Sequence, residues 1–322
     1  MIDPEILKQV RRIQVRTSRL VTDVMAGGYS SVFRGSGIEF DEVREYSEGD
    51  DPRAVDWNVT ARVGRPYVKK FVEERELTVL FLLDLSASMA SGARERSARD
   101  AAAEFCACLA LTADRSNDKV GMIAYSDRVE RYVPAKKGSG HALRLVRDCL
   151  ALEAAHRPTD PVPALEFLAR VVRRRAVVFW VSDFETRLNQ TSALSLCARR
   201  HDLIAARMLT PELDWGCAED ESVRGPLALK RRAEERRRGT AVDRPRGLVR
   251  LRNVETGADR PVDFSSPAVR RAWRDTAASH ITATAEMFRR AGVDLLDIPV
   301  EAPVVDPILR FFERRERRVG HL

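Results

Sequence analysis

Three apolar runs, each separated from the next by a helical pattern, constrain the fold of this chain more than any other feature. The runs are TVLFLLD at 78–84, KVGMIAYS at 119–126 and AVVFWVSD at 176–183. Strands that are apolar on both sides are typical of parallel sheets whose two faces are covered by helices. The alternation therefore predicts an α/β fold, a doubly wound and mostly parallel sheet with helices on both faces.

The other segments of the chain extend this alternation. We expect a helix from Ser97 to Thr112 and a hairpin partner at 128–136 for the strand at 119–126. Further helices are expected at 140–152, 162–175, 190–200, 267–291 and 306–318, further strands at 202–209 and 293–300, and a hairpin across 247–264 that turns at Thr256-Gly257.

The first 76 residues have a different pattern. Residues 3–25 carry apolar side chains at helical spacing, and the following residues up to 76 form short β-like runs with turn clusters such as GDDPR and VGRPY. We therefore expect an N-terminal helix at 1–27, a small β-rich subdomain at 28–76 and a main domain at 77–322. A basic insertion near 215–246 interrupts the main domain.

Composition excludes several classes of protein. With 44% hydrophobic and 32% charged residues, the chain is globular and not disordered. No apolar run approaches the roughly 20 residues of a membrane-spanning helix, so a cytoplasmic location is expected. The five cysteines form no CxxC pair, which suits a reducing compartment, and the five histidines show no metal-ligand spacing and are expected at the surface or at helix caps.

The formal charge of +7 is concentrated in two stretches, KRRAEERRR at 230–238 and RFFERRERR at 310–318. Basic runs of this kind can bind nucleic acid, although most are the solvated faces of arginine-rich helices. No aromatic residue interleaves the first stretch, as one would in a protein that stacks single-stranded bases. Nucleic-acid binding is therefore not expected to be the main role.

Acidic and hydroxyl side chains follow two of the apolar runs. Asp84, Ser86 and Ser88 end the first run at every second position, and Asp183 ends the third. Thr159 and Asp160 lie in a loop between helices. Ligands of open α/β sheets bind beyond the carboxyl ends of the strands, and hard oxygen donors suit Mg²⁺ or Mn²⁺.

This spacing resembles the von Willebrand factor A-type domains that carry a metal-ion-dependent adhesion site. Their motif has the form Asp-x-Ser-x-Ser, then a threonine in a later loop and an aspartate after a later strand. The resemblance implies a metal bound by Asp84, Ser86, Ser88, Thr159 and Asp183, with Asp160 and Ser182 just outside this ligand set. The alternative is that these side chains are helix caps, a common use of Asp and Ser after a strand and one that applies most directly to Thr159.

A second resemblance covers residues 30–318. The segment from Phe33 to Glu76 and the closing GVDLLDIPV and PILRFFERRERR are similar to the bacterial domain-of-unknown-function family numbered fifty-eight. Its members carry this A-type domain and are often encoded with MoxR-type AAA+ ATPases. The resemblance implies a binding module whose metal accepts an acidic side chain of a partner, either such an ATPase or a client protein that the ATPase remodels.

Catalysis is the alternative to a binding role. A strand-end aspartate beside Mg²⁺ is also found in phosphotransferases with an aspartyl nucleophile. Those of the haloacid dehalogenase type need a second acid two residues later, where this chain has Ser86. A Walker phosphate loop and a GxSxG motif are also absent. We expect no enzyme; the alternatives are a Mg²⁺-dependent phosphotransferase or hydrolase that uses Asp84, and nucleic-acid binding through the basic insertion.

Overall fold

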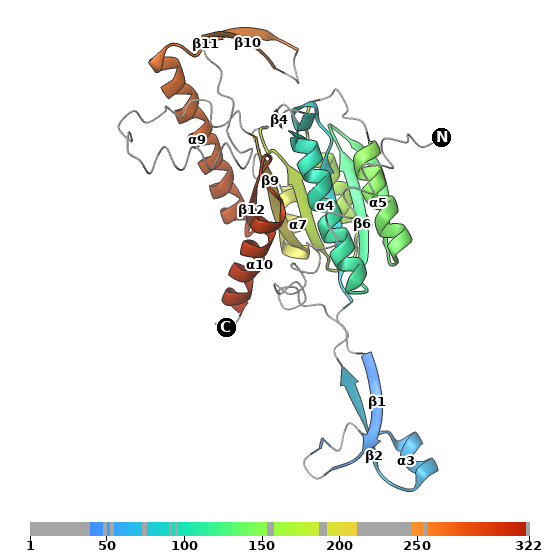
Figure 1. Ribbon diagram of the computed structural model, residues 1–322. Coiled ribbons are helices and arrows are strands. Elements are labelled where there is room, and N and C mark those ends of the chain that lie inside the picture. The colour runs from blue at the N-terminus through green and yellow to red at the C-terminus, as the bar shows by residue number, and fades with distance from the viewer. Residues whose placement is uncertain are drawn as a thin grey trace. The chain divides into compact units, whose positions relative to one another are not determined.

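The computed structural model describes residues 39–47, 50–51, 55–72, 76–90, 92–93, 96–152, 158–186, 192–210, 247–253 and 257–319 (Figure 1). The chain divides into two compact units, residues 33–77 and residues 1–32 together with 78–322. The expected N-terminal helix at 1–27 and the basic insertion near 215–246 lie outside the described residues, so both stay predictions.

The small unit is built on two antiparallel strands. β1 (Glu39–Glu45) pairs with β2 (Tyr67–Val72), and the segment between them contains the short helix α3 (Trp57–Val63). Asp56 caps this helix by accepting backbone N–H groups of its first turn, and Gly64 ends it in the left-handed region at φ 75°. Short polar residues therefore set the bounds of α3.

The large unit is built on a six-stranded sheet in which all neighbouring strands pair in parallel except β6 and β7, which pair antiparallel. Across the sheet the strands are β12 (Asp294–Pro299), β9 (Asp202–Leu209), β8 (Val177–Ser182), β3 (Thr78–Asp84), β6 (Lys119–Tyr125) and β7 (Val129–Lys136). The predicted α/β fold with a mostly parallel sheet is confirmed, as is the antiparallel partner of β6.

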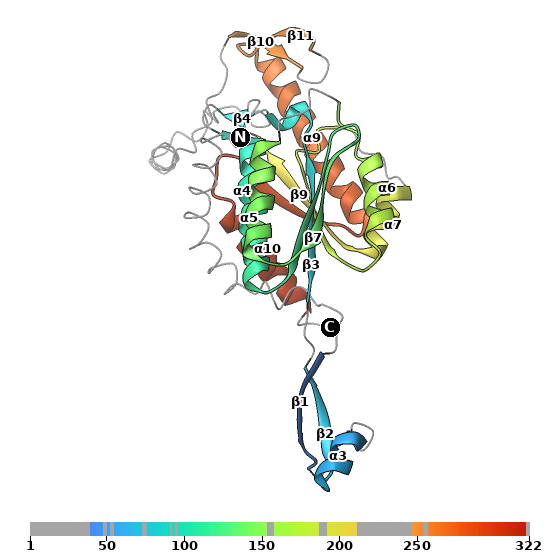
Figure 2. The same cartoon turned by 90° about the vertical axis from the view of Figure 1, so that its right-hand side faces the viewer.

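Helices cover both faces of this sheet. Figure 2, which views the sheet edge-on, shows α4 (Ala98–Arg115), α5 (Ser139–Ala151) and α10 (Val305–Val319) on one face and α6 (Val162–Val171), α7 (Ser192–Arg200) and α9 (Pro267–Ala291) on the other. Short elements complete the unit: the 3-10 turn η2 (Ala87–Ala90), the pair β4 (Gly92–Ala93) and β5 (Arg96–Ser97), and the hairpin β10 (Leu248–Arg252) and β11 (Asp259–Asp263).

Helix bounds follow local signals where these exist. Ser266 caps α9, Pro267 is its first residue and Gly292 ends it at φ 71°, so its predicted range is confirmed. Helix α6 is shorter than predicted, because it ends at Val171 and not at 175. The guanidinium of Arg200 donates hydrogen bonds to carbonyls at this end, to Ala169 at 2.7 Å and Arg173 at 3.2 Å, which stabilises the early termination.

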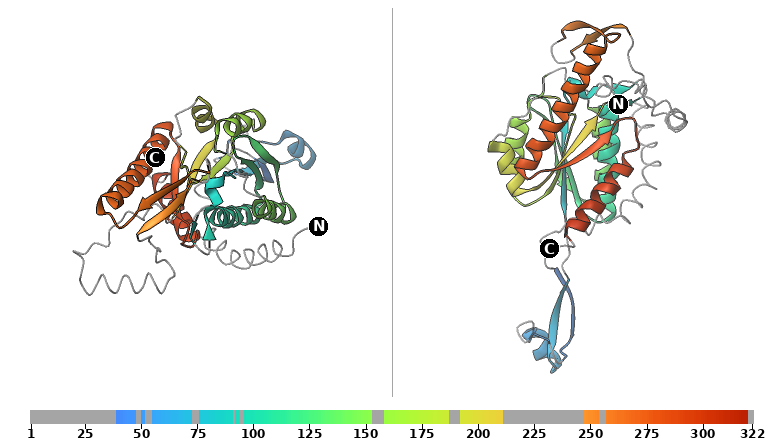
Figure 3. Two further views of the ribbon diagram at one scale, coloured as in Figure 1. Left: turned by 90° about the horizontal axis from the view of Figure 1, so that it is seen from above. Right: turned by 90° about the vertical axis from the view of Figure 1, so that its left-hand side faces the viewer.

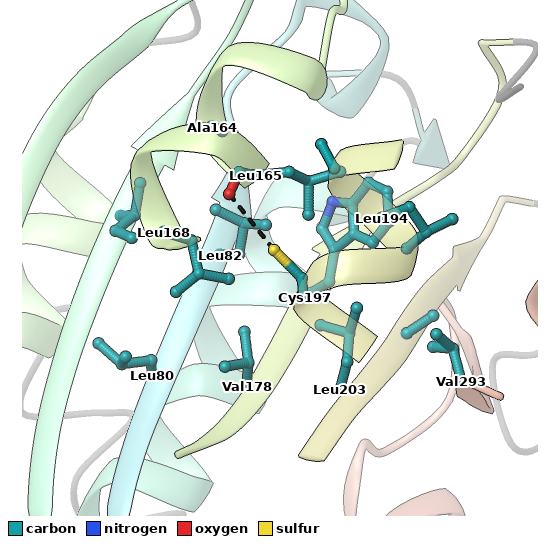
Figure 4. Close-up of a cluster of buried hydrophobic side chains, with 14 of the residues drawn as sticks. Leu80, Leu82, Ala164, Leu165, Leu168, Val178, Leu194, Cys197, Leu203 and Val293 are labelled. Carbon is teal, nitrogen blue, oxygen red and sulfur yellow. Dashed lines mark hydrogen bonds between the residues drawn. The ribbon is translucent and has the colours of Figure 1, made fainter. Parts of the chain in front are cut away.

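The core on the α6 and α7 face is formed by alternate residues of the strands (Figure 4). Leu80, Leu82 and Val178 lie beneath Leu165, Leu168 and Cys197 of the two helices. The Trp180 ring contacts the rings of Phe184 and Phe288 edge-to-face, with centroid distances of 5.0 Å and 5.7 Å. Apolar burial on this scale holds the strand ends, and thus the loops after them, in fixed places.

Gly121 is the position where the β6–β7 pairing leaves no room for a side chain. The register shifts between Val120 and Met122, and a Cβ at Gly121 would lie 2.8 Å from the backbone nitrogen of Ala135 and 2.9 Å from a Leu80 methyl. Gly121→Ala is therefore expected to lower the free energy of unfolding by roughly 1–3 kcal/mol, measured by urea titration. Gly140→Ala in α5 is the matched control, because its Cβ would meet nothing within 4 Å.

The control is expected to be neutral or stabilising by up to about 1 kcal/mol, since Gly140 has helical backbone in the first turn of α5 and alanine reduces the conformational freedom of the unfolded chain. Equal unfolding midpoints for Gly121→Ala and the wild type would contradict the packing described for β6 and β7.

Candidate functional site

The candidate site lies at the carboxyl end of β3. The helices that connect to the strands on either side of β3 lie on opposite faces of the sheet. From β3 the chain passes through α4 to β6 on one side, whereas β8 on the other side follows α6. Helices α4 and α6 cover opposite faces of the sheet (Figure 2). Loops that separate in this way leave a crevice beyond the carboxyl ends of the strands, which is where open α/β sheets bind ligands.

Asp84 is the centre of the cluster and is fully buried. Strands β3 and β8 are paired up to Leu83 and Val181, so Asp84 and Ser182 end neighbouring strands. The Ser182 hydroxyl donates to Asp84 Oδ2 at 2.6 Å, and the backbone N–H of Ser86 donates to Oδ1 at 2.8 Å. Both carboxylate oxygens are therefore held in a fixed orientation at the sheet edge.

Two more hydroxyls lie beside this carboxylate. Ser86 is fully buried and Ser88 is 5% exposed, and their Oγ atoms are 3.0 Å apart. Ser88 belongs to η2, whose single tight turn brings the two hydroxyls together. The alternate spacing predicted from the sequence thus places three oxygen-bearing side chains in one buried group.

The second acid, Asp183, follows β8 and is also buried. Its Oδ1 accepts the backbone N–H of Glu185 at 3.1 Å, and Ser182 Oγ accepts the N–H of Phe184 at 3.0 Å. Phe184 has φ 54°, a conformation that costs a non-glycine residue on the order of 1 kcal/mol or more and recurs at functional sites. The packing of the Phe184 ring on Trp180 helps to hold this strained turn.

The electrostatics of the cluster reflect two acids that share a dry environment. Burial, and then the neighbouring Asp183 carboxylate, raise the pKa of Asp84 to about 7, although hydrogen bonds from Ser182 and Ser86 act in the opposite direction. Burial also raises the pKa of Tyr125 well above its usual value, with Asp84 adding to the effect. Asp84 forms no ion pair with any residue in the described part of the chain.

The loop with Thr159 and Asp160 reaches the next strand end. The backbone N–H of Asp160 donates to the carbonyl of Ser126, directly after β6, at 3.0 Å. Thr159 is half-buried here, whereas Asp160 is exposed and its Oδ1 accepts the N–H of Val162 at the start of α6. The loop that contains Thr159 therefore lies beside the end of β6, the neighbour of β3. The Asp160 side chain accepts a hydrogen bond at the start of α6.

The donor set at the site consists of oxygen atoms. Among the described residues, no group of three or more His, Cys, Asp and Glu side chains is arranged to hold a metal. The cluster instead combines two carboxylates, Asp84 and Asp183, with the hydroxyls of Ser86 and Ser88. Such a set of hard oxygen donors fits an ion of the Mg²⁺ type, which retains water in part of its coordination sphere.

Several residues at the site were not foreseen from the sequence. The Trp180 indole N–H donates to the Tyr125 hydroxyl at 2.7 Å beneath the cluster, and His280 Nε2 lies 2.9 Å from the carbonyl oxygen of Phe184. Away from the site, at the amino end of β9, His201 was expected at the surface or a cap but is buried at 2% exposure, and burial lowers its pKa to about 4. The Trp180–Tyr125 and His280–Phe184 contacts join residues far apart in sequence. The only hint of them in the sequence is the aromatic character of these side chains.

Three mycobacterial relatives are described as uncharacterized proteins. Proteins of Mycobacterium bovis and Mycobacterium tuberculosis are each 27% identical over 318 residues, which cover 98% of this chain and 91% of the relative. A Mycobacterium avium protein is 25% identical over 188 residues, 58% of this chain and 94% of its own length. In the described part of the chain, no helix is both long and apolar enough to cross a bilayer.

Two solved structures are similar at low identity. The conserved hypothetical protein BatB from Bacteroides thetaiotaomicron is 14% identical with a TM-score of 0.42, over 76% of this chain and 100% of BatB. An aerotolerance-related membrane protein from Bacteroides fragilis is 14% identical with a TM-score of 0.40, over 75% of this chain and 99% of its own. A family model matches residues 42–214, which include both aspartates of the site. The chain belongs to the family described as protein of unknown function DUF58.

Proposed function

We propose that this chain is a metal-dependent protein-binding module of the von Willebrand factor A type. The observation that carries the proposal is the burial of two carboxylates, Asp84 and Asp183, with two serine hydroxyls at the ends of adjacent strands. The proposed ligands are Asp84, Ser86, Ser88, Thr159 and Asp183. A bound Mg²⁺ or Mn²⁺ would offset the two negative charges and offer an open position to a carboxylate of the partner.

The surrounding residues support such a role by fixing the donors. Ser182 and the Ser86 backbone each occupy one oxygen of Asp84, so this carboxylate cannot rotate freely. The Phe184 ring, directly after Asp183, packs on Trp180 in the core. Donors held by packing and hydrogen bonds lose little entropy when an ion binds.

Metal affinity is expected to depend on pH because the ion competes with a proton for Asp84. With the pKa of Asp84 raised to about 7, this carboxyl is mostly protonated at pH 6 and mostly ionised at pH 8. The apparent affinity for Mg²⁺ should therefore rise about tenfold from pH 6 to pH 8, as titration calorimetry would show. An affinity that stays constant over this range would contradict the environment described for Asp84.

We further propose that the partner is a MoxR-type AAA+ ATPase or a client of that ATPase, and that binding serves protein remodelling or the maturation of a complex. The support is the family resemblance and the chemistry of the site, which suits an acidic side chain. Co-purification from the native cell, with and without Mg²⁺ and ATP, tests this step. Capture of an ATPase that is lost on chelation is the expected result, and capture unaffected by chelation would contradict it.

We propose no catalytic role for the chain. Aspartyl phosphotransferases of the haloacid dehalogenase type carry a second acid two residues after the nucleophile, and in this chain that residue is Ser86. The Ser86 hydroxyl contacts the Ser88 hydroxyl. Metal-dependent turnover of ATP or a phosphate ester that disappears in Asp84→Asn would favour an enzyme instead.

A further inference from the structure

A second surface of the large unit lies along the edge of its sheet. Strand β12 pairs with β9 on one side, and no strand in the described part of the chain pairs with its other side. Figure 3 (right) shows this edge between α9 and α10. An unpaired strand edge presents backbone N–H and C=O groups to which another extended chain can bond.

Two adjoining hollows follow this edge, with volumes of about 430 Å³ and 370 Å³. Two residues of β12, Asp294 and Leu295, line the first hollow, and three line the second, from Leu295 to Asp297. Because Leu295 and Arg314 line both, the hollows form one continuous groove, here called the edge groove. Phe311 and Leu295 supply apolar side chains to its wall.

The edge groove carries an excess of positive charge, because six arginines line it against three acids. Arg315 and Arg318 already pair with Asp294, at 3.2 Å and 3.0 Å. Four further arginines line the groove, are exposed, and form no ion pair with any described residue: Arg289, Arg310, Arg314 and Arg317. Two further acids line the second hollow: Asp297, which is bound by Arg207 at 2.8 Å, and the exposed Glu313.

We propose that the edge groove binds an extended acidic segment of a partner protein, which adds to the sheet as a strand beside β12. Backbone hydrogen bonds to the strand edge would supply affinity, and the arginines would select acidic side chains. A second copy of this chain is disfavoured, because its edge would bring arginines against arginines. This surface is separate from the metal site, so its binding should not require an ion.

The probe is a fluorescein-labelled peptide of alternating glutamate and valine, followed by fluorescence anisotropy on the full chain. The double variant Arg289→Glu with Arg314→Glu should weaken binding about tenfold or more, since two charge-assisted contacts are reversed. The matched control is Arg250→Glu with Arg271→Glu, two exposed arginines outside the groove, and it should bind as the wild type does. A lysine–valine peptide should not bind.

Backbone pairing has its own readouts. A glutamate–valine peptide with N-methyl groups at two successive central residues, which block both of its edges, should lose binding. Hydrogen exchange should slow at 294–299 when the unmodified peptide binds. The proposal is overturned if the methylated peptide binds equally, if protection appears elsewhere, or if chelation abolishes binding. It is also overturned if the edge amides are already protected without peptide, or if the chain dimerises through this edge.

Discussion

Asp84→Asn is expected to lower the affinity for Mg²⁺ and Mn²⁺ by at least about 100-fold, because even residues that only support metal ligands contribute 10–100-fold. The same variant should be as stable as the metal-free wild type at pH 8, or more stable. The folded-state pKa of Asp84 lies above its ordinary value, so its ionisation destabilises the fold as pH rises from about 4 to 7. The asparagine side chain is uncharged at every pH in this range, so the variant avoids this loss of stability.

Asp148→Asn is the matched control for this experiment. Asp148 is also buried, but it lies on α5 and pairs with Arg147 at 2.6 Å, with Arg131 and Arg144 nearby. Its removal should leave metal affinity unchanged and lower the free energy of unfolding by about 1 kcal/mol, since its partners are partly exposed. Calorimetry and thermal melts of the two variants separate the roles; unchanged metal affinity in Asp84→Asn would remove the site from the proposal.

Partner capture is the second large effect. Chelation, and Ser86→Ala combined with Ser88→Ala, should each weaken capture of the ATPase or client by about tenfold or more, because a charge-assisted contact through the ion is lost. Neutralising Arg236, Arg237 and Arg238, which lie outside the described residues, should have a smaller effect, chiefly on association rate and salt dependence. A pull-down across a salt series measures both.

The opposite ranking in that pull-down would identify a different working surface. If the arginine substitutions abolish capture while chelation leaves it intact, the basic insertion binds the partner and the acid–hydroxyl cluster does not.

Much of the fold could be predicted because its signals are local. The run from Thr78 to Leu83 is apolar at every position except the first, which is typical of a strand buried on both faces. Helix α9 begins at a proline and ends before a glycine, so its bounds follow from two residues. Asp84, Ser86 and Ser88 are close in sequence, so one tight turn is enough to bring their side chains together, and their proximity could be predicted.

The remainder depends on the order of strands, which local patterns do not specify. The contact of Ser182 with Asp84 joins residues 98 positions apart and follows from the register of β3 with β8. The position of β12 at the sheet edge follows from its pairing with β9, not from its own residues. His201 is buried because α7 ends against β9, although its sequence neighbours are charged.

The most direct test of the proposed function is a crystal structure of the chain soaked in Mn²⁺, with the ion located by anomalous scattering. The proposal predicts one strong peak bounded by the Asp84 carboxylate and the hydroxyls of Ser86 and Ser88, with Asp183 and Thr159 bound directly or through water. The peak should be absent from Asp84→Asn crystals. A wild-type crystal with no peak at these residues, or with Mn²⁺ bound only elsewhere, would contradict the proposed function.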